Sequence, residues 1–167
     1  MIETLVDSSD QSTPEGVAVL DQAYEANWSV TMSIGVDTDV QRLFQALTVP
    51  EFLEAWIEMP GLTNDSWVAA SQLKNGYQIS HRFANRAAVS ITGSFLFCHR
   101  RKMRLIWQKA ADRMHMKSLV DFRLRGNFGS SVLELRHTQL DSAEEFLWHQ
   151  QLWHGSLKKL AFLLRSA

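Results

Sequence analysis

The sequence predicts an α+β domain in which a curved antiparallel sheet of about seven strands wraps around a long C-terminal helix, with two short helices after the first strand. Three observations predict this class. Residues 28–36 alternate between apolar and polar side chains without interruption, which is typical of a strand with one buried face. Asn75-Gly76 separates two strand-like segments, and Asn-Gly favours a tight hairpin turn. After Asp141, large apolar residues recur every three or four positions, as on one face of a helix.

Two short helices are expected between the first strand and Pro60-Gly61, a pair that would end the second of them. Asp37 is placed to cap the first helix, because an aspartate side chain accepts hydrogen bonds from the free N–H groups of a first turn. Thr48 and Glu51 have the spacing of a capping box at the start of the second helix. Apolar residues follow each cap at helical spacing, so both helices are expected to bury one face.

Six more strands are expected to follow as an antiparallel meander, because their connections are short. They cover residues 67–73, 77–83, 88–98, 105–107, 116–124 and 130–137. Asp141 and Glu144 then have capping-box spacing at the start of the last helix. This helix is the one element long enough to cover the apolar face of the sheet. The space between sheet and helix is therefore the natural place for a ligand.

The chain has 167 residues, of which 46% are apolar and 21% charged, and it is expected to form one domain over residues 27–167. Residues 1–26 are expected to form an acidic arm, partly disordered or with a short helix, since no Lys or Arg precedes Arg42. The single Cys98 excludes an internal disulfide. The sequence also lacks a secretory signal and an apolar run that could span a bilayer, which together indicate a cytoplasmic protein.

Several short motifs in a fixed order carry a resemblance to one superfamily. They are residues 46–51 with Trp56, Gly93 in a middle strand, residues 135–140 before the last helix, and residues 149–160 within it. In these motifs, and in the order of its strands and helices, the chain resembles the START-like, or SRPBCC, superfamily with its helix-grip fold. Within the superfamily it is similar to the branch related to the C-terminal domain of the Aha-type activator of a heat-shock ATPase.

The resemblance implies one fold but several different roles. Members of the superfamily bind hydrophobic ligands, cyclise polyketides, carry lipids or assist chaperones. Two departures from the family pattern bear on the size of a cavity. Leu152 stands where the family usually has a glycine, and Gln139-Leu140 lacks the glycine that follows the last strand. A homodimer is compatible with the family and with the separation of acidic from basic residues along the chain.

Aromatic and histidine side chains that are predicted to face inward make up the candidate ligand site. Bulky rings would shape an apolar pocket, and histidines would supply a few orienting hydrogen bonds. The candidate ligand-binding residues are Trp56, Tyr77, His81, Phe83, Trp107, Phe122, His137, His149 and Trp153. In the competing interpretation the rings fill the core and neighbouring polar groups satisfy each histidine, a backbone carbonyl or a carboxylate doing so for His149.

Three functional hypotheses follow from these residues. The first is a non-enzymatic domain that binds an apolar or aromatic small molecule and needs no cofactor and no metal. The second is a protein-interaction module that acts on a chaperone or another protein, with an exposed Trp148 in its contact surface. The third is a cyclase-like or hydrolase-like enzyme in which His81 or His137 serves as acid or base.

The sequence does not contain the residue patterns of a zinc-protease site, a cysteine nucleophile with its base, or a nucleic-acid site. His149 and His154 are five residues apart on a helix and diverge by about 140°, so they cannot form the i, i+4 pair of a zinc protease. Cys98 and His99 are adjacent on a strand and point to opposite faces, which argues against a nucleophile with its base. The four basic residues of the turn at 99–104 are interpreted as a solvated surface and not as a nucleic-acid site.

Overall fold

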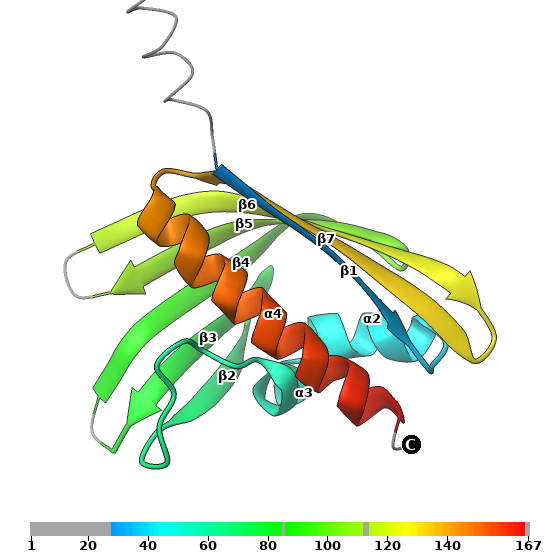
Figure 1. The fold of residues 1–167 in the computed structure, drawn as a ribbon, viewed down its shortest axis with the longest axis horizontal. Coiled ribbons are helices and arrows are strands. Elements are labelled where there is room, and N and C mark those ends of the chain that lie inside the picture. Colours follow the sequence, from blue (N-terminus) through cyan, green and yellow to red (C-terminus); the bar gives the residue numbers. More distant parts are fainter. Residues whose placement is uncertain (1–27, 85, 112–113, 166–167) are drawn as a thin grey trace, which may run out of the picture.

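The predicted fold class is confirmed by the computed structural model, which describes residues 28–84, 86–111 and 114–165. The predicted acidic arm lies outside the described residues. The elements are β1 (Trp28–Val36), α2 (Val40–Thr48), α3 (Pro50–Trp56), β2 (Trp67–Leu73), β3 (Gly76–Phe83), β4 (Arg86–His99), β5 (Lys102–Ala111), β6 (Met114–Asn127), β7 (Ser130–Leu140) and α4 (Ala143–Arg165). Figure 1 shows one curved sheet with α4 lying along its concave side and α2 and α3 near the C-terminal half of that helix.

The seven strands form one antiparallel sheet in the order β1-β7-β6-β5-β4-β3-β2. Strands β2 to β7 each pair with their neighbours in sequence, as the predicted meander requires. Strand β1 instead pairs with β7, from Trp28 opposite Leu140 to Val36 opposite Ser131. Helix α4 also packs against β1, so the first and last described elements lie together.

The caps of the two short helices differ from the predicted ones. Asp39, and not Asp37, caps α2, because its Oδ1 accepts a hydrogen bond from the backbone N–H of Arg42 at 2.9 Å. Asp37 instead forms an exposed ion pair with Arg165 at 3.3 Å. The predicted capping box of α3 is wrong, since Thr48 donates back to the carbonyl oxygen of Phe44 and α3 begins at a proline without a side-chain cap. A hydroxyl near a helix end can bond either way, which spacing alone does not decide.

Helix α4 is capped one residue later than predicted. The Oγ atom of Ser142 accepts a hydrogen bond from the backbone N–H of Glu145 at 3.2 Å, so Ser142 and Glu145 occupy the two capping-box positions in place of Asp141 and Glu144. The shift of one residue turns Glu145 inward and leaves Glu144 exposed. Within the described part of the chain, no helix combines the length and apolar character needed to cross a membrane.

Because Gly93 has no side chain, the ring of Tyr77 can pack directly over it on the inner face of the sheet. The two residues are opposite each other on β3 and β4, and Tyr77 is 1% exposed on the inner face. A Cβ atom at position 93 would lie 2.8 Å from Cε2 of Tyr77 and 3.1 Å from a methyl group of Leu105. The Gly93 of the family motif therefore has a packing role in this chain.

Replacing Gly93 by alanine is expected to lower the free energy of unfolding by roughly 1–3 kcal/mol, because the added methyl group overpacks the core beside Tyr77. Urea denaturation followed by fluorescence measures the change. Gly35 on β1 provides a matched control, since a Cβ atom there meets no atom within 4 Å. Equal stabilities of the Gly93→Ala and Gly35→Ala variants would contradict the packing role.

Candidate functional site

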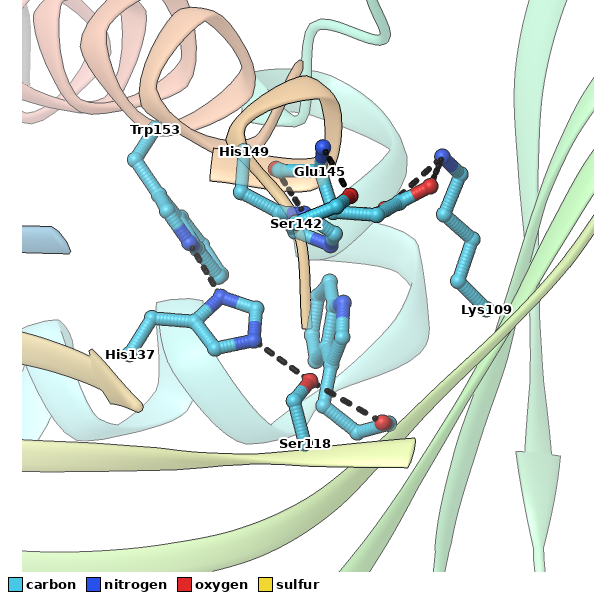
Figure 2. Close-up of polar contacts among 8 residues, drawn as sticks. Lys109, Ser118, His137, Ser142, Glu145, His149 and Trp153 are labelled. Carbon is cyan, nitrogen blue, oxygen red and sulfur yellow. Dashed lines mark hydrogen bonds and ion pairs between the residues drawn. The ribbon is translucent and has the colours of Figure 1, made fainter. Parts of the chain in front are cut away.

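A buried group of polar side chains lies between the inner face of the sheet and the N-terminal half of α4 (Figure 2). We call it the polar cluster; it consists of Lys109 on β5, Ser118 on β6, His137 on β7, and Glu145, His149 and Trp153 on α4. All six residues are less than a tenth exposed. The three helical residues are spaced by four and therefore share one face of α4. The strand residues face inward through the alternation of their strands.

His137 is held at both ring nitrogens. Nε1–H of Trp153 donates to its Nδ1 atom at 3.0 Å, so the proton of the neutral ring is on Nε2. Nε2 lies 2.6 Å from Oγ of Ser118, and the Ser118 hydroxyl in turn donates to the carbonyl oxygen of Trp107 at 3.3 Å. Hydrogen bonds thus connect Trp153 on α4 to Trp107 on β5 through His137 and Ser118, and both ring nitrogens of His137 are satisfied.

His149 is held at only one of its two nitrogens. Its Nδ1–H donates to the backbone carbonyl oxygen of Glu145 at 2.8 Å, which is one of the two partners predicted for it from the sequence. Nε2 of His149 is buried and has no hydrogen-bond partner among the described residues, and the same holds for Nε1 of Trp107. Both rings lie against His137, with ring centroids 4.5 Å and 5.9 Å from it. An unpaired acceptor and an unpaired donor therefore flank the same histidine.

A buried ion pair closes one side of the polar cluster. Nζ of Lys109 lies 2.8 Å and 3.0 Å from the two carboxylate oxygens of Glu145. The same Nζ atom lies 4.1 Å from the ring centroid of Trp148, a geometry that favours a cation–π interaction. The prediction of an exposed Trp148 is wrong for this reason, since the ring is half-buried beneath Lys109.

Burial keeps both histidines of the cluster neutral. Loss of solvent lowers the pKa of His137 well below its usual value, and the charge of a protonated His149 would lower it further. Burial also lowers the pKa of His149 to about 4; the hydrogen bond to the Glu145 carbonyl opposes this shift, and the Lys109 cation adds to it. At neutral pH, Nε2 of His149 is therefore a bare acceptor.

Acidification between pH about 6.5 and about 4 is expected to destabilise the protein. In this range an unfolded histidine binds a proton, whereas His149 in the folded protein does not. The unfolded state then carries more protons, so stability is lost as the pH falls, by up to roughly 1.4 kcal/mol per pH unit for each such histidine. Urea unfolding at a series of pH values should show a shallower dependence for His149→Gln and an unchanged one for the exposed His154→Gln. Equal slopes in all three proteins would contradict the assignment.

The structure brings five of the nine predicted site residues together. Ring contacts connect Trp107, Phe122, His137, His149 and Trp153, with Trp107 and Trp153 5.1 Å apart. Tyr77 packs edge-on against Phe95 in the core. Nε1 of Trp56 donates to the carbonyl oxygen of Ala46 at 2.7 Å.

His81 and Phe83 form a separate pair farther along β3, with ring centroids 4.9 Å apart. His81 is 3% exposed, burial lowers its pKa, and its Nε2 atom has no partner among the described residues. Phe83 is half-buried.

Three residues of the polar cluster were not predicted from the sequence: Lys109, Ser118 and Glu145. The signal for Lys109 was present, since it continues the inward alternation of Leu105 and Trp107.

The hollows that the structure describes lie outside the polar cluster. One of about 510 Å³ lies on the outer face of the sheet and is lined by charged side chains. Another of about 190 Å³ is an apolar groove between α2, α3 and the end of α4, and Trp56 is the one predicted site residue that lines it. Among the described residues, no three His, Cys, Asp or Glu side chains are grouped so that they could hold a metal ion.

Comparisons with known proteins agree with this fold. The family model described as Activator of Hsp90 ATPase homolog 1-like protein matches residues 37–165. No curated protein matches the sequence. The AHSA1 protein from Silicibacter pomeroyi is 20% identical over 83% of this chain and 98% of that chain, with a TM-score of 0.66.

Two further solved structures are similar at the level of the fold. The Aha1 dimer from Colwellia psychrerythraea is 21% identical over 82% of this chain and 96% of that chain, with a TM-score of 0.57. CalU16 from Micromonospora echinospora is 19% identical over 81% of this chain and 75% of that chain, also with a TM-score of 0.57. These findings and the family model confirm the resemblance that the motifs indicated. The chain belongs to the family of Activator of Hsp90 ATPase homolog 1-like proteins.

Proposed function

We propose that this domain binds a small, largely apolar molecule with a hydroxyl group, between the inner face of the sheet and α4. The observation that carries the proposal is the pair of unpaired polar atoms beside His137, namely Nε1–H of Trp107 and Nε2 of His149. A buried polar atom without a partner costs about 1–3 kcal/mol. A hydroxyl group can accept from the indole and donate to the imidazole, and so satisfies both.

The charge and size of the ligand follow from the same surroundings. A carboxylate could accept from Trp107 but has no proton to donate to a neutral His149. The rings of Trp107, Trp153 and Phe122 already contact one another, and Leu152 is fully buried where relatives usually have a glycine. The cavity that the sequence predicts between the sheet and the last helix is not among the described hollows. Since a ligand must displace packed side chains to enter, we propose a neutral molecule no larger than a substituted phenol.

Binding has more support than acid–base catalysis. A general base works best with a pKa near the working pH, whereas burial lowers the pKa of His137, His149 and His81. Both nitrogens of His137 are engaged. Lys109 is tied to a carboxylate. These groups position a ligand better than they transfer a proton.

Phenol serves as the test ligand, with native mass spectrometry of the purified protein to detect any molecule already bound. Titration should shift the indole ¹H–¹⁵N resonance of Trp107, and Trp107→Phe and His149→Leu should each weaken binding about tenfold. Trp67→Phe, at an exposed position of β2, is the matched control and should bind phenol as the parent protein does. No bound mass together with no resonance shift, or equal affinity in all variants, would refute the proposal in favour of a filled core.

Self-association through the apolar groove is a second candidate function. Phe52 and Leu163 line this groove while being 48% and 38% exposed, and Arg42 is its one charged lining residue. The proposed occupant is a second copy of this chain, because one structural neighbour is described as a dimer. Analytical ultracentrifugation should find a dimer that Leu163→Glu dissociates. The control is Phe128→Glu in the β6–β7 turn, whose side chain is fully exposed. A monomeric parent protein would contradict self-association and leave the groove to another protein.

A further inference from the structure

The outer face of the sheet carries a charged groove on the side opposite α4. A hollow of about 510 Å³ there is lined by residues of β1, β5, β6 and β7. A second hollow of about 320 Å³ shares Arg104, Asp121 and Arg136 with it and extends to Ser29. We call the two together the outer groove. Its side chains alternate along each strand with those that face the core.

Two arginines in the outer groove form no ion pair with any residue that the structure describes. Asp121 is engaged by Arg104, at 2.7 Å and 3.1 Å. Glu134, the other carboxylate of the groove, pairs with Arg125 at 3.2 Å. Arg123 and Arg136 are exposed and make no ion pair with any described residue. Each lies opposite a carboxylate residue in the β6–β7 ladder, Arg123 opposite Glu134 and Arg136 opposite Asp121, but those carboxylates pair with other arginines. The groove thus presents two guanidinium groups that no described carboxylate pairs with, and such groups suit carboxylates in a bidentate geometry.

The chain carries a matching set of carboxylates directly before β1. Residues 1–27 contain no Lys or Arg, and their acidic residues are Glu3, Asp7, Asp10, Glu15, Asp21 and Glu25. The first described residues are Trp28 and Ser29, and Ser29 lines the outer groove. The acidic segment is therefore joined to the chain at the groove itself. A tether this short keeps its carboxylates near the arginines at roughly millimolar effective concentration.

We infer that residues 1–27 dock in the outer groove, where their carboxylates bind Arg123 and Arg136 and compete with any other anion for this face. The inference does not depend on the proposed ligand, which occupies the opposite side of the sheet. The pairs are solvent-exposed, so salt weakens them: the screening length falls from about 10 Å at 0.1 M to about 3 Å at 1 M. Docking is accordingly expected at low salt and lost at high salt.

Paramagnetic broadening in the full-length protein tests the inference. A spin label is attached at Ser12→Cys in a Cys98→Ser background, because the Cys98 thiol is exposed and Ser12→Cys retains all six carboxylates. At about 0.05 M salt the backbone amides of Thr31, Arg123 and Arg136 should lose roughly half or more of their intensity, and at about 1 M salt they should recover. The amides of α4, on the other side of the sheet, should keep theirs.

Charge reversal separates docking from simple proximity. Arg123→Glu with Arg136→Glu should abolish the broadening, whereas Arg82→Glu, an exposed arginine of β3 outside the groove, should retain it. Dispersed amide spectra confirm that each variant is folded. Broadening that survives the double reversal, or is absent at low salt, would overturn the inference. A mixture of spin-labelled protein at natural isotope abundance with ¹⁵N-labelled protein that carries no spin label tests for exchange between copies. Broadening in this mixture would also overturn the inference, because the arm would then come from a second copy.

Discussion

Glu145→Ala is expected to lower the free energy of unfolding by roughly 3–5 kcal/mol, because it leaves the buried ammonium group of Lys109 without its carboxylate. Lys109 is 8% exposed, and without Glu145 its remaining favourable neighbour among the described residues is the ring of Trp148. The backbone cap of α4 should survive, since Ser142 receives its hydrogen bond from the Glu145 backbone N–H. Urea denaturation with a constant m-value would assign the loss to the folded state.

Two controls identify the charge as the cause. Glu144→Ala removes a neighbouring carboxylate that is exposed in the same first turn, and should cost no more than about 0.5 kcal/mol. The double variant Lys109→Met with Glu145→Leu removes both charges and should recover most of the lost stability, because an apolar pair of similar size needs no counter-ion. If Glu145→Ala were as stable as Glu144→Ala, the ion pair would have no such role.

Trp153→Ala is expected to lower the free energy of unfolding by roughly 3–5 kcal/mol, as is usual for a buried tryptophan. The ring is fully buried and contacts Trp107, Phe122 and His137. Its N–H group is also the donor that satisfies Nδ1 of His137. The substitution therefore opens a cavity and leaves a buried acceptor without a partner, which thermal or urea unfolding would detect.

Trp153→Phe separates these two contributions. Phenylalanine keeps an aromatic ring but has no N–H, so about 1–3 kcal/mol of the loss should remain from the unpaired His137 and the smaller ring. Trp67→Ala supplies the matched control, since Trp67 is 46% exposed at the sheet edge and should lose little stability. A Trp153→Phe variant as stable as the parent protein would show that the hydrogen bond to His137 contributes nothing.

The fold could be predicted from sequence because its signals are local. The uninterrupted alternation of residues 28–36 corresponds directly to β1. The predicted hairpin is present between β2 and β3, but its turn lies one residue earlier than predicted, at Lys74-Asn75, because Leu73 pairs with Gly76. The caps were less predictable, because Asp37, Asp39, Asp141 and Ser142 can all accept the same kind of hydrogen bond. Which of them does so depends on where the chain leaves the preceding strand, and this is set by packing.

The candidate site could be predicted only in part. Inward periodicity was enough to select His137, His149 and Trp153, which the structure brings together. It could not show that Lys109 and Glu145 are buried, because charged residues are rarely inside unless paired and the partner is thirty-six positions away. Hydrogen bonds such as that from Trp153 to His137 depend on the height of α4 above the sheet, which no sequence pattern encodes.

The pairing of β1 with β7 has a consequence for the order of folding. Each hairpin from β2 to β7 closes a short loop, whereas joining Val36 to Ser131 encloses roughly a hundred residues, and the entropy lost on closure grows with loop length. The meander is therefore expected to form first, with β1 and the helix that covers it completing the sheet late in the reaction. Contacts absent from the transition state govern the unfolding rate. The lifetime of the native protein is therefore expected to depend on the pairing of β1 with β7.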